Sequence, residues 1–419
     1  MFNRVSAKSI LLGAVSAVAL ISVAHAADVV APVQGTAGYN WSGLYVGFGG
    51  GAGGGVHDLT AGGTFALPFG RDGVFGELTV GYDYMVNERF LVGAYADARY
   101  GNIGFSLDVP GGSFKSEADY GFDVLARAGY LVTPQTLAYV LGGYSRQHFK
   151  ISATGVGTFY DWSSNGYVLG LGMETVVHNN WTLKGEYRYS KYASNDLGSG
   201  GFISTDPSYH TFHVGLNYRL NGGATDAGFE TPAYNWTGFY VGGALGAGST
   251  KDKFGNFFGT GSFNGFGGDG VLGELSAGYD HDFGSWVAGV MVDGRYSGIS
   301  SEVGSGFGLG FKVSADYGFD VLGRVGMKAS ESTLAYVLGG YSLQHMKLDV
   351  PSGGGGGPLP DWNSSGYSVG GGIESALTDK VAVNLEYRYS HFASKDVGGG
   401  TEITPSFQTV RLGLKYKFN

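Results

Sequence analysis

The sequence predicts an all-β fold, a transmembrane antiparallel up-and-down β-barrel built as two tandem eight-stranded barrels. The chain contains two copies of one unit, each copy has eight segments of alternating polarity, and short and long connections alternate between them. The composition agrees, because 79 of 419 residues are Gly and only 15% are charged, against about 7% and 25% in ordinary domains. After residue 26 no apolar run reaches the length of a spanning helix, so the hydrophobicity has to lie in alternating strands.

The first 26 residues are expected to be a secretory signal peptide. Arg4 and Lys8 form a basic start, which is followed by a short apolar stretch and by small residues that place the cleavage after Ala26. The apolar stretch is shorter than the roughly 20 residues of a membrane anchor. An N-terminal segment at 27–40 then leads into the first repeat.

Cysteine content and charge narrow the functional classes. The chain has no Cys, so an exported form has no disulfide framework and depends on its backbone hydrogen bonds. The net charge of -9 gives no basic surface for nucleic acid. The sequence therefore predicts an exported protein of the cell outer membrane that does not bind nucleic acid.

Internal duplication organises the chain. The segments 39–43, 118–125, 137–145 and 186–190 return at 234–238, 315–322, 334–342 and 386–390. This places a first barrel repeat at 41–220, a Gly-rich flexible linker at 221–237 and a second barrel repeat at 238–419.

Each copy divides into eight predicted strands with period-two alternation. The expected ranges are 43–54, 74–86, 90–102, 118–132, 136–150, 164–177, 181–192 and 209–220 in the first copy, and 238–250, 270–283, 286–299, 314–329, 332–348, 365–377, 381–392 and 406–418 in the second. Tight turns at 87–89, 133–135, 178–180, 284–285, 330–331 and 378–380 alternate with long connections, which in the first copy lie at 55–73, 103–117, 151–163 and 193–208. Short inner turns and longer outer loops are typical of outer-membrane barrels.

The two faces of each strand are assigned to lipid and lumen. In the last strand Val410, Leu412, Leu414, Tyr416 and Phe418 share one face, which we expect to meet lipid. The opposite faces collect charges of both signs, and in a narrow barrel such charges have to pair. A structural ladder of ion pairs is favoured over an ion pathway or a catalytic site. The predicted ladder residues are Glu77, Asp97, Arg99, Asp123, Arg127, Glu186, Arg188, Glu274, Asp293, Arg295, Asp320, Arg324, Glu386 and Arg388.

Two closed barrels are favoured over one sixteen-stranded barrel. Eight strands let each copy close without an edge in lipid. A single large barrel would need the linker as an unusually long inner turn, and it would enclose an aqueous channel of the porin class.

The motifs together resemble a known family. Tyr-Asn-Trp-Ser/Thr-Gly at the start of each copy, Glu-Tyr-Arg-Tyr-Ser in each seventh strand and Val-Arg-Leu-Gly-Leu-Lys-Tyr-Lys-Phe at the end are similar to the small outer-membrane β-barrel surface proteins of alphaproteobacteria, often called porin-family. The resemblance implies barrels like the transmembrane domain of OmpA, inserted by the outer-membrane assembly machinery. Phe418 is the expected assembly signal, although Asn419 follows it. Members of this family usually carry one barrel, whereas this chain contains two copies of the unit.

The histidines give little support for chemistry. His148 and His345 occupy equivalent places and are expected to be solvated, and no repeated His is expected beside Asp119 or Asp316, so an enzyme is not predicted. No cofactor or metal site is expected. The predicted role is structural, in envelope integrity and through exposed outer loops, with lipids and lipopolysaccharide as partners. The alternatives are a passive diffusion porin for small hydrophilic solutes and, more weakly, a surface protein that binds haemin.

Overall fold

The computed structural model describes most of the chain beyond its N-terminus. The described ranges are 38–61, 65–109, 111–197, 203–225, 228–257, 261–303, 310–349, 361–397 and 400–418. The expected signal peptide at 1–26 lies outside the described residues, as does the segment at 27–37. Among the described residues no helix is long and apolar enough to cross a membrane.

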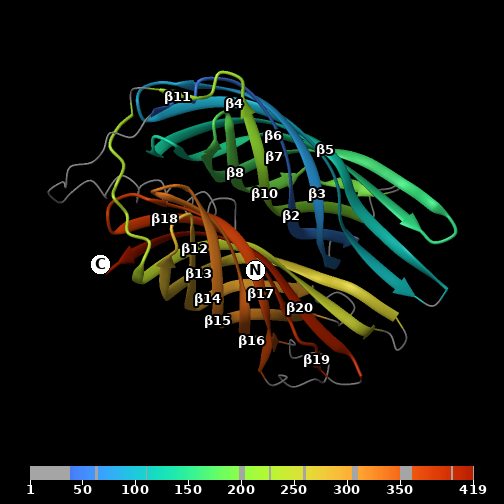
Figure 1. The fold of residues 1–419 in the computed structure, drawn as a ribbon. Coiled ribbons are helices and arrows are strands. Elements are labelled where there is room, and N and C mark those ends of the chain that lie inside the picture. Colours follow the sequence, from blue (N-terminus) through green and yellow to red (C-terminus); the bar gives the residue numbers. More distant parts are fainter. Residues whose placement is uncertain are drawn as a thin grey trace.

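Long antiparallel strands make up both halves of the described chain (Figure 1). The first half contains β2 (Gly43–Ala61), β3 (Phe65–Met85), β4 (Phe90–Val109), β5 (Gly112–Thr133), β6 (Thr136–Ala153), β7 (Gly157–His178), β8 (Trp181–Tyr192), the short β9 (Asn195–Leu197) and β10 (Ile203–Arg219). The second half contains β12 (Gly238–Phe257), β13 (Gly261–Asp282), β14 (Trp286–Val303), β15 (Phe311–Ser330), β16 (Thr333–Asp349), β17 (Trp362–Ala376), β18 (Val381–Phe392), the short β19 (Lys395–Asp396) and β20 (Glu402–Lys417).

Each half closes on itself. In the first barrel β10 pairs with β2 along its whole length, from Ile203 opposite Ala61 to Arg219 opposite Tyr45. In the second barrel β20 pairs with β12 in the same way. Backbone pairing between the halves is limited, within the described residues, to bridges of β13 with β3 and β4, such as Phe266 with Phe69. The pairing confirms two eight-stranded barrels and excludes the single sixteen-stranded alternative.

The two ends of each barrel differ. The turn end carries the short connections, for example Asn179 and Asn180 between β7 and β8, where Asn179 adopts a positive φ of 46°. The opposite end carries the remaining connections, such as those between β4 and β5 and between β6 and β7, and we call it the hairpin end. There the expected long loops at 55–73, 103–117 and 151–163 were wrong, because the strands continue through them.

Pairing continues almost to the hairpin tips, and His57 still lies opposite Phe69 and Ile151 opposite Tyr160. Strands of 17 to 22 residues, such as β5 and β10, exceed the roughly 9–11 residues that span a bilayer. Gly-rich segments such as 50–55 can form strands because the hydrogen bonds between strands need no side chain. Inside a narrow barrel, Gly also leaves room for large neighbours, and a Cβ at Gly81 would collide with the Tyr45 ring.

The barrels lie side by side through equivalent faces. A buried apolar cluster joins β5, β7, β8 and β10 of the first barrel to β17, β18 and β20 of the second; it comprises Val132, Met173, Tyr187, Tyr189, Phe212, Ile373, Val383, Leu385 and Val410. At the turn end the hydroxyls of Thr136 and Thr333, which occupy equivalent positions, lie 2.8 Å apart. Part of the face assigned to lipid, including Val410, therefore contacts the other barrel instead. The contact joins equivalent faces of the two barrels, as an interface with two-fold symmetry does.

The segment between the barrels carries ordered contacts. β11 (Ala224–Thr225) pairs with β1 (Gly38–Tyr39) as a two-stranded ribbon. Phe229 lies under the Arg89 guanidinium, 4.0 Å from the ring centroid. The linker is thus held against the turn end of the first barrel.

Candidate functional site

The lumen is the candidate site, and an indole closes it at the turn end of each barrel. Trp41 is fully buried and its Nε1 donates to the Pro134 carbonyl at 3.0 Å. Trp236 repeats this contact with the Glu331 carbonyl at 2.8 Å. The Arg219 guanidinium donates to the Trp41 carbonyl at 2.8 Å and lies over the indole, which holds the ring across the barrel end.

In the first barrel a network of ion pairs fills the middle of the lumen. Arg188 lies 2.7 Å from Asp97 and 2.8 Å from Asp123, and it also contacts Glu186. Arg99 contacts Asp123 at 2.6 Å on the side of the hairpin end. These side chains are almost fully buried, so each charge depends on its partners rather than on water.

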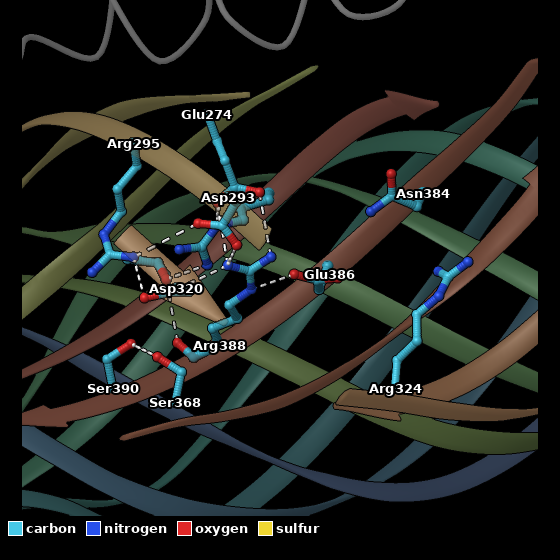
Figure 2. Close-up of polar contacts among 12 residues, drawn as sticks. Glu274, Asp293, Arg295, Asp320, Arg324, Ser368, Asn384, Glu386, Arg388 and Ser390 are labelled. Atoms are coloured by element: carbon cyan, nitrogen blue, oxygen red, sulfur yellow. Dashed lines mark hydrogen bonds and ion pairs between the residues drawn. The ribbon is translucent and has the colours of Figure 1, made fainter. Parts of the chain in front are cut away.

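The same network recurs in the second barrel, where Figure 2 shows Arg388 among four carboxylates. The distances are 2.5 Å to Glu386, 2.7 Å to Asp293, 3.1 Å to Asp320 and 3.3 Å to Glu274. Four acidic groups around one guanidinium need further cations. Arg295 lies 2.6 Å from Asp320, and Arg411 lies 2.7 Å from Glu274.

All fourteen residues of the predicted ladder lie in ion pairs of this kind. Arg127 and Arg324 form the layer nearest the turn end, where they contact Glu174 at 2.8 Å and Glu374 at 2.6 Å. The prediction did not include Asp83 and Asp280, which are fully buried and pair with the same two arginines. The alternation that selected Glu77 would have found Asp83, because six residues along a strand is an even spacing.

The hairpin end of each lumen has a different filling. In the first barrel it holds Phe75, Ile103, Ala118, Phe149, Tyr192 and Tyr209, with Trp162 packed against them. In the second it holds a larger apolar cluster that includes Phe254, Phe266, Leu272, Ile299, Met346, Trp362, Phe392, Ile403 and Phe407. In the first barrel a cavity of about 30 Å³ lies between the ion-pair network and the aromatic filling of the hairpin end. Arg99, Asp123 and Tyr209 are among the residues that line it. A space of this size is enough to hold water.

His148 and His345 were expected to be solvated, and this expectation was wrong. His148 Nδ1 lies 2.7 Å from Asp119, and His345 Nδ1 lies 2.7 Å from Asp316. Each imidazole also stacks on the tyrosine that follows its aspartate, and the His148 side chain is only 13% exposed. A strand irregularity between Ala118 and Gly121 interrupts the alternation and turns Asp119 toward His148. Within the described residues no group of three or more His, Cys, Asp or Glu is arranged to hold a metal ion.

The outer surfaces carry large apolar side chains. Leu78 and Leu275, which occupy equivalent positions, are 68% and 75% exposed, and Phe418 is 63% exposed beside Tyr416. Such a surface is abnormal for a protein in water and suits a barrel whose solvent is lipid. Closed antiparallel barrels with apolar outer faces are the architecture of outer-membrane β-barrel proteins.

Comparison with known sequences defines the family. The chain belongs to the family described as outer membrane protein beta-barrel domain, whose model matches residues 14–219 and again 224–418. It is therefore a protein of the cell outer membrane. Since short turns face the periplasm in such barrels, the hairpin end faces outward.

Individual relatives resemble one half of the chain at a time. The 31 kDa outer-membrane immunogenic protein of Brucella melitensis is 29% identical over 51% of this chain and all of its own length. The 22 kDa outer membrane protein of Rhizobium leguminosarum is 32% identical over 45% of this chain and 80% of its own. Among solved structures, Neisserial surface protein A matches 43% of this chain and 98% of its own, with 20% identity and a TM-score of 0.29.

Proposed function

We propose that the chain is a structural protein of the outer membrane whose two barrels strengthen the envelope and present long hairpins at the cell surface, without conducting solutes. The observation that carries the proposal is the Arg188 and Arg388 networks, which cross the lumens between an indole cap and an aromatic layer. A passive channel needs a continuous aqueous path, and side chains occupy that path here.

Conductance of the full chain in planar bilayers tests the proposal. We expect no step increases in current at protein concentrations at which a general porin, reconstituted in parallel, inserts readily. Regular conductance steps that depend on folded protein would overturn the closed-lumen proposal and establish the diffusion-porin alternative. Heat-dependent gel mobility of the same sample verifies that the barrels are folded.

The hairpin end supports the surface role. The β5–β6 and β15–β16 strands extend beyond the length needed for the bilayer, so they carry their tips outward. The Brucella relative is named as immunogenic, and surface exposure would account for a similar property here. We also propose that lipopolysaccharide surrounds this end and that the assembly machinery recognises Phe418.

Haemin capture by the hairpins remains the weaker proposal, since no particular contact favours it. It has a simple test in the same preparation. Addition of haemin to folded protein would shift the Soret band if an imidazole such as that of His148 or His345 became an axial ligand. An unchanged spectrum at saturating protein would dispose of this alternative.

A further inference from the structure

The hairpin-end layer of the first barrel contains a buried cation that makes no ion pair among the described residues. Arg71 is 2% exposed, and its two Nη atoms donate to the hydroxyls of Tyr209 and Ser116 at 3.4 and 2.6 Å. Its remaining described contacts are with the faces of Phe105 and Phe149, at 5.2 and 6.0 Å from the ring centroids. The Glu117 carboxylate lies near enough to attract Arg71, but it pairs with Lys115 at 2.6 Å and with Lys150 at 3.8 Å. A buried guanidinium without an ion pair of its own is a costly arrangement.

Other donors around it also lack partners. Arg71 Nε, Trp162 Nε1, His57 Nε2 and Thr205 Oγ1 are all buried without a hydrogen-bond partner. His57 and Thr205 are 2% and 1% exposed. The rings surround Phe149, with the His57 centroid at 5.4 Å and the Trp162 centroid at 5.2 Å from it. Three of these groups, Arg71, His57 and Trp162, lie around Phe149, and one of them is charged, so this layer calls for an acceptor.

The second barrel shows that the fold does not require this arrangement. Strand pairing makes Gly268 equivalent to Arg71, since these residues lie opposite Thr250 and Gly55, respectively. By the same pairing Asp252 replaces His57, Val313 replaces Ser116, Ile403 replaces Thr205 and Phe407 replaces Tyr209. Asp252 is satisfied by the hydroxyls of Ser301 and Thr250 at 2.6 and 3.2 Å. Among its described residues the second barrel thus has no cation at this place and carries a carboxylate satisfied by hydroxyls, whereas the first barrel carries a guanidinium.

We propose that the hairpin-end layer of the first barrel is a binding site for a small monovalent anion, a halide or a carboxylate group, with Arg71 as its central cation. The site takes an anion because the gathered groups donate and the nearest charge is positive. The positive charge of Arg71 repels cations from the same site. The aromatic walls of Phe105, Phe149 and Trp162 exclude water from the ligand and strengthen its contact with the guanidinium.

Crystals of the full chain grown in a bromide salt provide the direct test. We expect an anomalous bromide peak at hydrogen-bond distance from Arg71 Nε and Trp162 Nε1, and no peak at the corresponding place beside Gly268. A parallel crystal in formate distinguishes a carboxylate site from a halide site. Only water at Arg71, in both crystals, would overturn the proposal and leave Arg71 as a packing residue.

A matched pair of indoles provides the test in solution. Trp162 and Trp362 occupy equivalent positions, and both have an Nε1 without a partner. We expect bromide or formate, added to the folded chain in an isethionate buffer, to raise the thermal midpoint in a saturable way. Trp162→Phe should weaken the apparent affinity roughly tenfold, as the loss of one hydrogen bond to an anion does, whereas Trp362→Phe should leave it unchanged.

Arg71→Gln removes the positive charge but keeps a shorter polar side chain, and we expect it to abolish the anion effect. If that variant does not fold, the Trp162 and Trp362 pair still decides the matter. Equal responses of these two variants would contradict the proposal, because a general salt effect on the barrels would then explain the stabilisation.

Discussion

The Phe212 ring of the first barrel stacks on the Tyr387 ring of the second, with centroids 5.2 Å apart and an angle of 8° between the planes. Both rings project from outer faces that would meet lipid in a single barrel. In a bilayer the association of such faces depends on close packing and on a few hydrogen bonds, since lipid is as apolar as the partner. The Thr136–Thr333 contact and the bond from Gln408 Nε2 to the Gly53 carbonyl, at 3.0 Å, supply such bonds.

A disulfide should therefore form across the interface in the double variant Thr136→Cys/Thr333→Cys. The two hydroxyls lie 2.8 Å apart, and the chain has no Cys of its own to compete. We expect an intramolecular cross-link that changes the mobility of the denatured, non-reduced chain and disappears on reduction. Each single-cysteine variant serves as the control. A folded double variant that stays reduced under mild oxidation would show that the barrels do not associate through this face.

Each half should fold alone. Because β10 pairs with β2 and β20 with β12, a chain of residues 27–224 and one of residues 233–419 both contain a complete ring of strands. We expect each half, refolded in detergent, to migrate differently before and after boiling, and we expect the same of the whole chain from residue 27 onward. If only the whole chain showed this shift, the two separate closures would be refuted and one larger barrel restored.

The strand period accounts for most of what the sequence could predict. Alternation located the strands and selected lumen residues such as Glu77 and Arg188, because one face of a closed strand has a single environment. Alternation could not predict whether lipid or the other barrel covers the outward face of a strand. Val410 was assigned to lipid by the same rule that applies to Leu78, yet it lies between the barrels. Partners that are distant in sequence leave no local periodicity.

Two further features depended on contacts of the same long-range kind. The repeated Tyr-Asn-Trp motif indicated the duplication and the family resemblance but not its structural role, in which Trp41 reaches 93 residues along the chain to Pro134. Arg71 was not selected because it lay in a segment taken as a loop. The pairing of Asp119 with His148 needs the strand irregularity at Ala118, which period-two counting does not foresee.

Removal of the central guanidinium should destabilise the second barrel strongly. Arg388→Met leaves Glu386, Asp293, Asp320 and Glu274 short of one cation in a buried site. The expected loss in the free energy of unfolding is about 3–5 kcal/mol. Urea unfolding of the refolded chain, followed by tryptophan fluorescence, measures it. Lys347→Met is the control, because this exposed cation contacts Asp316 at the surface and its loss should hardly change the free energy of unfolding. Equal losses in both variants would contradict a stabilising role for the lumen network.

The exposed C-terminal aromatic should affect assembly rather than stability. Phe418 is 63% exposed and contacts only Tyr416 in the rings described, so Phe418→Ala removes little packing. We expect a smaller heat-modifiable fraction in outer membranes but an unchanged unfolding curve for refolded protein. Tyr416→Ala, on the same face, is the matched control. Normal assembly of the Phe418 variant would show that the machinery reads another segment.

The indole caps should stabilise the barrels without being their only seal. Trp236→Ala empties a fully buried position at the turn end, which typically costs about 3–5 kcal/mol. Trp236→Phe keeps most of the packing and loses only the bond to the Glu331 carbonyl, so about 1 kcal/mol is expected. Because the Arg388 network still crosses the lumen above the cap, neither variant should conduct in a planar bilayer. Conductance steps in Trp236→Ala but not in the parent chain would show that the cap alone closes the barrel and that the ion pairs leave a path for solutes.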